Sequence, residues 1–175
     1  MKKNNLAFID IETTGLDLIE NEIIEIGCVL VTPELEVIEE ISIKVKPEHI
    51  EKANKTSLKI NHYNEEDWAK AISLEQAMSI LARKTKDAIM VGQNISFDAS
   101  FIDYAFAKLS MKNPMHYHKL DTIAIAWAKL HRDPDLKHFS LREMCVRFGI
   151  KNEHSHTALS DARATFELYK KLMEL

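Results

Sequence analysis

The sequence predicts a single α/β domain in which helices cover both faces of a mixed sheet. Two observations indicate this fold class. Three strand-like segments with short connections open the chain, and helical and strand-like segments alternate after them. The 175 residues, of which 46% are hydrophobic and 29% charged, can bury a sizeable core, which excludes a disordered or collagen-like chain. We therefore expect one domain over residues 1–175.

The first part of the chain predicts an antiparallel meander. Strand-like apolar runs cover 6–12, 23–31 and 37–45, and a Thr-Pro-Glu turn separates the last two. In the third run, Ile41, Ile43 and Val45 alternate with polar residues, so that one face is apolar and the other faces water. This alternation is typical of an edge strand.

The remaining elements follow from periodicity and capping signals. The stretch 46–72 has an irregular and polar pattern. Ser73 and Gln76 have capping-box spacing and open a helix that runs to about residue 86. A second capping box at Ser140 opens a helix that Gly149 ends. The other expected elements are strands at 88–92 and 116–120 and helices at 96–109, 122–131 and 158–175.

Charge, cysteine content and the N-terminal sequence narrow the class of protein. The net charge of −4 disfavours a protein that coats long duplexes, because Lys and Arg dominate such binding, but it allows a few nucleotides to be held through metal ions. Cys28 and Cys145 lack zinc or disulfide spacing and are expected to be reduced core residues. The first apolar run is too short for a signal sequence or a membrane span, so we expect a cytoplasmic protein without a membrane partner.

Two carboxylates on the first strand are the clearest candidates for chemistry. Asp10 and Glu12 are two residues apart, and the two-residue period of a strand points both side chains to one face. A solvent-facing acidic pair is the alternative, but the flanking residues Phe8 to Ile11 are typical of a central strand, where charges almost never lie unpaired. We therefore predict a functional pair.

Two later segments add an acid each and one histidine. Asp98 lies in the first turn of the helix that follows strand 88–92, where it could equally complement the helix dipole. Asp161 lies in the first turn of the last helix, and His156 lies in the loop just before it. Alone, each residue is typical of a cap or a surface position. Together they form a demanding combination.

These three segments resemble the three motifs of the DnaQ-like, or DEDDh, 3′-to-5′ exonucleases. The motifs occur in the family's order as Asp10-x-Glu12-Thr13-Thr14-Gly15-Leu16, Asn94-x-x-Phe97-Asp98 and His156-x-Ala158-x-x-Asp161-Ala162. The resemblance covers about 6–172, which is the expected core of the domain. It implies an RNase H-like fold with a five-stranded mixed sheet flanked by helices. It also implies two divalent metal ions held by the four carboxylates, and His156 as the general base.

Physical chemistry supports these implied roles. Four converging carboxylates repel one another, and hard divalent cations such as Mg²⁺ or Mn²⁺ neutralise them with all-oxygen ligands. Two such ions ~3.5–4 Å apart stabilise the attacking and the leaving oxygens of a phosphoryl displacement. Imidazole accepts a proton near neutral pH. His156 is preferred to His154 because its five-residue offset to Asp161 matches the family, and His154 is interpreted as a surface residue.

By resemblance, the terminal nucleotide contacts residues of the first two motifs. The residues implied are the backbone of Ile11 and Thr13 and the side chains of Thr14, Leu16 and Phe97. Leu16 and Phe97 fit a core role equally well. Between Lys129 and Lys151, six Lys or Arg stand against three Asp or Glu, which fits both a path for phosphates and a solvated helix face.

We thus expect an exonuclease that releases nucleoside 5′-monophosphates from the 3′ end of a single-stranded nucleic acid, with DNA favoured over RNA. A proofreading subunit of a DNA polymerase is an alternative, although the last helix ends at Leu175 without a docking tail, which favours a stand-alone enzyme. An oligoribonuclease-like enzyme is disfavoured by Thr13, where those enzymes typically have Met. An inactive nucleic-acid-binding module is disfavoured because all five residues are present. The metal used and the choice between monomer and homodimer stay open.

Overall fold

The computed structural model describes residues 4–152 and 155–175. Its sheet has five strands in the order β3-β2-β1-β4-β5. They are β1 (Leu6–Thr13), β2 (Ile23–Val31), β3 (Val37–Lys44), β4 (Ile89–Gly92) and β5 (Lys119–Asp121). The first three strands pair antiparallel, and β4 is parallel to both β1 and β5. The predicted meander and the mixed five-stranded sheet are confirmed.

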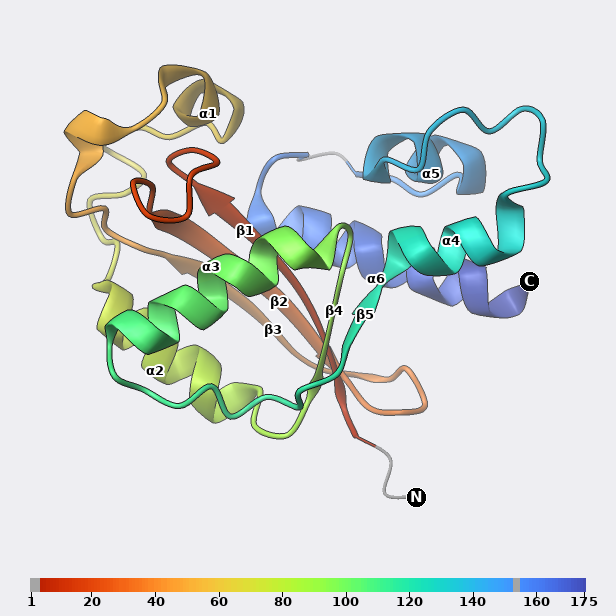
Figure 1. Ribbon diagram of the computed structural model, residues 1–175, viewed down its shortest axis with the longest axis horizontal. Coiled ribbons are helices and arrows are strands. Elements are labelled where there is room, and N and C mark those ends of the chain that lie inside the picture. The colour runs from red at the N-terminus through yellow and green to blue at the C-terminus, as the bar shows by residue number, and fades with distance from the viewer. Residues whose placement is uncertain (1–3, 153–154) are drawn as a thin grey trace.

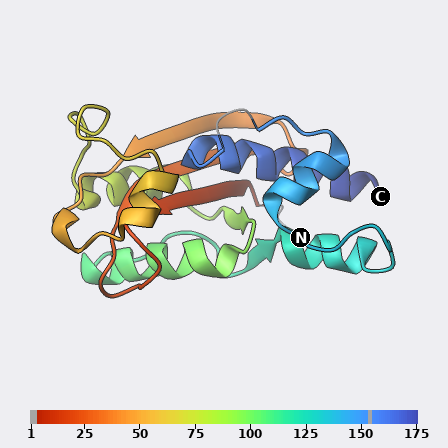
Figure 2. The same ribbon diagram turned by 90° about the horizontal axis from the view of Figure 1, so that it is seen from above.

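Helices lie on both faces of this sheet, as predicted (Figures 1 and 2). They are the short 3-10 helix η1 (Ile50–Lys52) and the α-helices α1 (Lys55–Ile60), α2 (Leu74–Lys84), α3 (Ile95–Lys108), α4 (Thr122–Leu130), α5 (Leu141–Phe148) and α6 (Ala158–Glu174). Helices α2 and α3 cover one face, and α6 covers the other. Helices α4 and α5 pack against α6. The sheet is thus the central layer.

The residues of β1 alternate between these two layers. Ala7, Ile9 and Ile11 belong to the core beneath α2 and α3, whereas Leu6 and Phe8 belong to the core beneath α6. The strand is therefore central and buried on both faces. At the opposite side of the meander, β3 is an edge strand as predicted. Its apolar side faces the core, while Ser42 is exposed.

The main departure from the sequence prediction lies in the segment 46–72, which contains η1 and α1 rather than only irregular chain. Both helices are very short and bury no residue, so they leave no apolar periodicity to recognise. Helix α1 instead depends on a cap, in which the Asn54 side chain accepts hydrogen bonds from the backbone N–H groups of Thr56 and Ser57.

Smaller differences concern the ends of elements. The strand expected at 116–120 is β5, which spans three residues because it pairs only with Met90–Gly92 of β4. The capping box at Ser73 is complete, with both reciprocal hydrogen bonds. At Ser140, the side chain accepts the predicted bond from the Glu143 backbone N–H. Across the described ranges 4–152 and 155–175, no helix is long and apolar enough to cross a membrane.

Candidate active site

Strand β1 carries Asp10 and Glu12 to the α6 side of the sheet. The residues between and beside them, Ile9 and Ile11, are buried toward α2 and α3, so the two acids face the other way. The acids also lie beyond the end of β4, which pairs with β1 only from Leu6 to Phe8. On its β4 side, this part of β1 is therefore open to groups from other elements.

Helix α6 brings Asp161 to the same place. Its first turn rests directly on β2 at Gly27, where an added Cβ would lie 2.1 Å from the backbone carbonyl carbon of Ala158. Only glycine permits this contact between helix and strand backbones. As a result, carboxylate oxygens of Asp10, Glu12 and Asp161 lie within 4.8 Å of one another.

Asp98 reaches the site from the first turn of α3, and it lies beside this trio rather than within it. The Asp98 side chain is buried, and its Oδ1 accepts a hydrogen bond of 3.0 Å from the backbone N–H of Ile11. That N–H is available because β4 ends before it. Burial raises the pKa of Asp98 to about 7, although the hydrogen bond from Ile11 opposes the rise.

The carboxylates are crowded enough to hold protons near neutral pH. Burial raises the pKa of Asp10 well above its ordinary value, and the neighbouring carboxylates raise it further, Asp98 most of all. For Glu12, burial and then the charge of Asp161 raise the pKa to about 8. Such a cluster requires either protons or cations. Since the donors are all carboxylate oxygens, the set fits a hard divalent cation.

The loop before α6 is held against Asp161 by polar contacts. The Asn152 side-chain amide donates to Oδ1 of Asp161 at 2.5 Å, and the His156 backbone N–H donates to Oδ2 at 3.1 Å. Ser160 in turn donates to the Asn152 side-chain oxygen at 2.7 Å. His156 has a left-handed backbone with φ of 68° and is exposed. His154, the other histidine considered as a base, lies outside the described residues.

A cavity of about 590 Å³ opens beside this loop. Its lining includes Asp161, His156, Ser155, Arg142 and Lys151. The cavity therefore joins one acid of the cluster to two cationic side chains. A space of this size is within the range of ligand pockets in proteins.

Comparison with known proteins decides the family. Residues 7–169 match the family model RNase_T, whose description is exonuclease. This chain belongs to that exonuclease family. Together with its structural neighbours, this match identifies a DEDDh-like exonuclease domain of the RNase H-like superfamily.

Two relatives are DNA polymerase components. DNA polymerase III subunit epsilon of Treponema pallidum is 31% identical over 162 residues, which make up 91% of this chain and 72% of that protein. DNA polymerase III PolC-type of Caldanaerobacter subterraneus is 32% identical over 172 residues, or 98% of this chain. The exonuclease domain spans only 12% of that polymerase.

Solved structures share the fold at low sequence identity. E. coli exonuclease I in complex with a dT13 oligonucleotide superimposes with a TM-score of 0.83 and 17% identity, over 97% of this chain and 41% of that one. The nuclease domain of 3′hExo, a DEDDh family member bound to rAMP, gives 0.77 and 16%, over 98% of this chain and 92% of that one. The exonuclease domain thus has the RNase H-like fold expected from its motifs.

In the loop after β1, the residues that the resemblance assigns to the nucleotide differ in their exposure to solvent. Thr13 and Thr14 are buried, and the Thr14 hydroxyl accepts a hydrogen bond of 2.9 Å from the Glu22 backbone N–H. Leu16 is 81% exposed and Ile19, which the sequence analysis did not single out, is 67% exposed. The tip of this loop therefore presents apolar side chains to solvent.

Phe97 differs from Leu16 in that it is partly committed to the core. It is half-buried on α3, and its ring centroid lies 5.0 Å from that of Phe101. Its remaining exposure leaves one part of the ring accessible. Of the two readings left open for Phe97, the structure therefore accommodates both at once.

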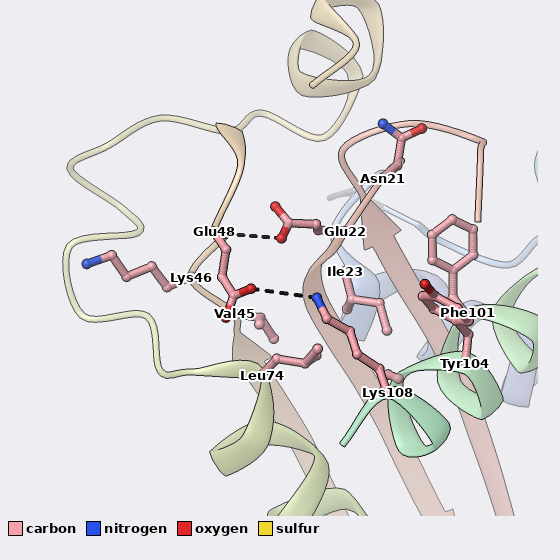
Figure 3. Close-up of a pocket in the computed structure, with 11 residues that line it drawn as sticks. Asn21, Glu22, Ile23, Val45, Lys46, Glu48, Leu74, Phe101, Tyr104 and Lys108 are labelled. Carbon is pink, nitrogen blue, oxygen red and sulfur yellow. Dashed lines mark hydrogen bonds and ion pairs between the residues drawn. The ribbon is translucent and has the colours of Figure 1, made fainter. Parts of the chain in front are cut away.

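A second cavity, shown in Figure 3, lies next to the loop between β1 and β2. It has a volume of about 30 Å³, and Ile23, Val45 and Phe101 are among its lining residues. Lys108 and Glu48 form an ion pair of 3.6 Å at its rim. The volume holds only about two water molecules, so this cavity does not accommodate a nucleotide.

Two residues near the acids escaped the sequence analysis. Asn152 belongs to no recognised motif, and only the folded loop shows its contact with Asp161. Glu25 is a buried residue of β2 and lies opposite Glu12 in the strand register. A sequence signal existed for it, because a single charge interrupts the apolar run Ile23–Val31.

Proposed function

We propose that this domain removes nucleoside 5′-monophosphates one at a time from the 3′ end of single-stranded DNA. The observation that carries the proposal is the cluster of Asp10, Glu12 and Asp161 within 4.8 Å, with Asp98 hydrogen-bonded alongside. Membership of the exonuclease family supports hydrolysis of terminal phosphodiester bonds. The single-stranded substrate is supported by the likeness to exonuclease I in complex with an oligonucleotide.

Members of this family depend on divalent metals, and we infer that the four carboxylates hold two ions, Mg²⁺ or Mn²⁺. When bound, such ions neutralise the crowded carboxylates and stabilise charge on the reacting phosphodiester oxygens. Asp10, Glu12 and Asp161 converge from β1 and α6, which lets one site bridge a strand and a helix. Asp98 contributes from α3 on the opposite side of β1.

His156 is the proposed general base. Imidazole has an unperturbed pKa suited to proton transfer near neutral pH. The His156 backbone is tied to Asp161, and the residue lines the cavity beside the acids. This position keeps the histidine next to the acid cluster while leaving its exposed side chain accessible to a substrate.

The terminal nucleotide is proposed to lie between the loop after β1 and the start of α3. The resemblance assigns these contacts to the backbone of Ile11 and Thr13 and to the side chains of Thr14, Leu16 and Phe97. Of these side chains, Thr14 is buried, so it would act by shaping the loop. Exposed Leu16 offers a sequence-tolerant apolar contact for a base. Arg142 and Lys151, which line the neighbouring cavity, are suited to the phosphates of the strand.

The direct test uses 5′-labelled single-stranded DNA and RNA of one sequence, incubated with Mg²⁺, Mn²⁺ or EDTA. The expected result is a metal-dependent ladder that shortens from the 3′ end, with DNA degraded faster than RNA. A single internal cut, or turnover that persists in EDTA, contradicts the proposed chemistry. Faster degradation of RNA than of DNA would support the proposed hydrolysis but contradict the preference for DNA.

The same assay tests the base. We expect His156→Ala to lower kcat by about 100-fold or more, since general-base catalysis contributes roughly 10²–10⁴-fold. Binding of Mn²⁺, measured by calorimetry, should stay near the wild-type value because the carboxylates are intact. His154→Ala is the matched control, and a larger loss in that variant would transfer the base role to His154.

Proofreading beside a DNA polymerase is a second candidate, favoured by the identity to the epsilon subunit and to the PolC-type polymerase. In that role the domain removes mismatched 3′ ends, and its location is the cytoplasm. Size-exclusion chromatography with light scattering, run with and without the replicative polymerase of the same cell, tests it. A stable complex with the polymerase supports proofreading, whereas a monomer or homodimer that does not bind the polymerase supports a stand-alone enzyme.

A further inference from the structure

Glu25 is a charged side chain in the most buried strand of the sheet. Every residue of β2 is buried, and Glu25 itself is only 4% exposed. In the strand register it lies opposite Glu12 on β1 and opposite Lys44 on β3. Paired residues on neighbouring strands share a face, so Glu25 points to the α6 side together with Glu12.

Lys44, opposite Glu25 on the edge strand, carries the opposite charge. Lys44 opposes the burial of this carboxylate electrostatically and holds its pKa down, although burial still raises it above the ordinary value. The Lys44 ammonium is itself held, because its Nζ lies 3.9 Å from the centroid of the Trp68 ring. Trp68 is anchored in turn by a hydrogen bond of 2.9 Å from its Nε1 to the Ile24 carbonyl.

Glu25 also contacts the beginning of α6. The backbone N–H of Ala158, the first residue of that helix, lies near the Glu25 carboxylate and helps to hold its pKa down, although burial has the larger effect and raises it. A negative charge at a helix N-terminus also interacts favourably with the helix dipole. Two residues further along β2, Gly27 allows the Ala158 backbone to approach the strand. The first turn of α6 thus lies directly against β2 at Gly27 and close to Glu25.

The contact of β2 with the start of α6 affects the acid cluster. Asp161 lies one turn after Ala158, and His156 lies two residues before Ala158. Among the described residues, the acids grouped closely enough to share an ion are Asp10, Glu12 and Asp161, and Glu25 is outside that group. We propose that Glu25 is a positioning residue, whose carboxylate docks the N-terminus of α6 and so holds Asp161 and the His156 loop against Asp10 and Glu12.

This inference rests on the proposed function for its link to turnover, but the docking is measurable without any substrate. The variants are Glu25→Ala, which removes the carboxylate, and Glu25→Gln, whose side-chain oxygen can accept from the Ala158 N–H without a charge. Thr85→Ala is the matched control, because it removes a buried hydrogen bond of 2.7 Å to the Leu81 carbonyl within α2. It tests whether loss of stability alone produces the effect.

For Glu25→Ala we expect kcat to fall and the dissociation constant for Mn²⁺ to rise, each by about 10–100-fold, the range found when partners that orient metal ligands are removed. The KM for DNA should stay within about threefold. Amide hydrogen exchange should quicken in the first turn of α6. Glu25→Gln should restore kcat and Mn²⁺ affinity to within about threefold of wild type, and Thr85→Ala should change neither.

Two results overturn the inference. If Glu25→Gln loses as much as Glu25→Ala, the charge matters rather than the docking contact, and Glu25 acts as a ligand or an electrostatic group. If Glu25→Ala keeps wild-type Mn²⁺ affinity and exchange rates, the contact does not position α6. A wild-type domain without nuclease activity contradicts the proposed function instead, while Mn²⁺ affinity and exchange still test the docking.

Discussion

Asp98 combines two requirements that normally conflict in a protein interior. Its carboxylate is buried and lies near other carboxylates, which is unfavourable for a charge, yet it accepts the hydrogen bond of the Ile11 backbone N–H. That bond satisfies a buried donor on β1 past the end of β4. The hydrogen bond and the negative charge can therefore be separated by substitution.

We predict that Asp98→Asn keeps the fold but abolishes turnover. The asparagine oxygen can still accept from Ile11, and loss of one carboxylate relieves repulsion, so the free energy of unfolding without metal should not fall. Asp98→Ala leaves the Ile11 N–H without this acceptor and should lose about 1–3 kcal/mol. Both should lower kcat by at least about 100-fold. Urea denaturation in EDTA and the exonuclease assay separate the effects, and near-normal turnover of Asp98→Asn would contradict a metal-holding role.

The positions of some of these residues could be predicted from the sequence, and the contacts of others could not. Asp10 and Glu12 could be placed on one face because the two-residue period of a strand is a local property. The contacts of Asn152 and Glu25 depend on how α6 and its preceding loop lie on the sheet, which no local pattern encodes. Glu25 could have been noticed as a buried charge, but its partner at Ala158 could not.

Among the elements, the contact between α6 and β2 depends most sharply on one residue. A Cβ at Gly27 would lie 2.1–2.3 Å from three backbone atoms of Ala158 and Leu159. Backbone atoms at the start of a helix cannot move aside singly, as the end of a flexible side chain can. Any added atom at Gly27 must therefore displace the first turn of α6.

We predict that Gly27→Ala destabilises the domain by about 1–3 kcal/mol, as overpacking of a core does, and lowers Mn²⁺ affinity and kcat together by at least about tenfold. Ser42→Ala is the control. Ser42 lies on β3 opposite Gly27 of β2, and its substitution by Ala adds no atom. Thermal unfolding and calorimetry provide the measurements. Wild-type Mn²⁺ affinity in Gly27→Ala would show that the position of α6 tolerates this displacement.

Most of the helices and strands could be predicted from the sequence, and the others lack a local signal. Strands β1 to β3 and helices α2 to α6 each carry apolar periodicity or a capping signal, and their ends fall within a few residues of expectation. Helices α1 and η1 bury nothing, and only α1 has a side-chain cap, at Asn54. Strand β5 is defined by pairing with β4, which is a tertiary property.

For the whole molecule, the acid cluster couples stability to pH and to metal. Folding raises the pKa of Asp98 to about 7 and that of Glu12 to about 8, so the folded protein binds more protons than the unfolded chain between about pH 4 and 8. The contribution of these groups to stability is therefore greatest at low pH. It is lost as pH rises through the folded-state pKa values.

We predict that the melting temperature in EDTA falls by several degrees between about pH 5 and pH 8. Mn²⁺ should raise it more at the higher pH, because ions replace protons on the carboxylates. Asp10→Asn should flatten the pH dependence in EDTA, since one repelling charge is gone. Differential scanning fluorimetry gives both series, and a melting temperature in EDTA that rises toward pH 8 would contradict the burial of these acids.

Strand β1 extends past β4, which pairs with it only as far as Phe8, whereas β2 accompanies it to Thr13. An open strand edge of this kind ordinarily invites a strand of another molecule and hence aggregation. Here the Asp98 side chain stands where a strand would pair, because its Oδ1 accepts a hydrogen bond from the Ile11 N–H. A strand of another molecule would have to displace Asp98 before it could pair with β1 at Ile11.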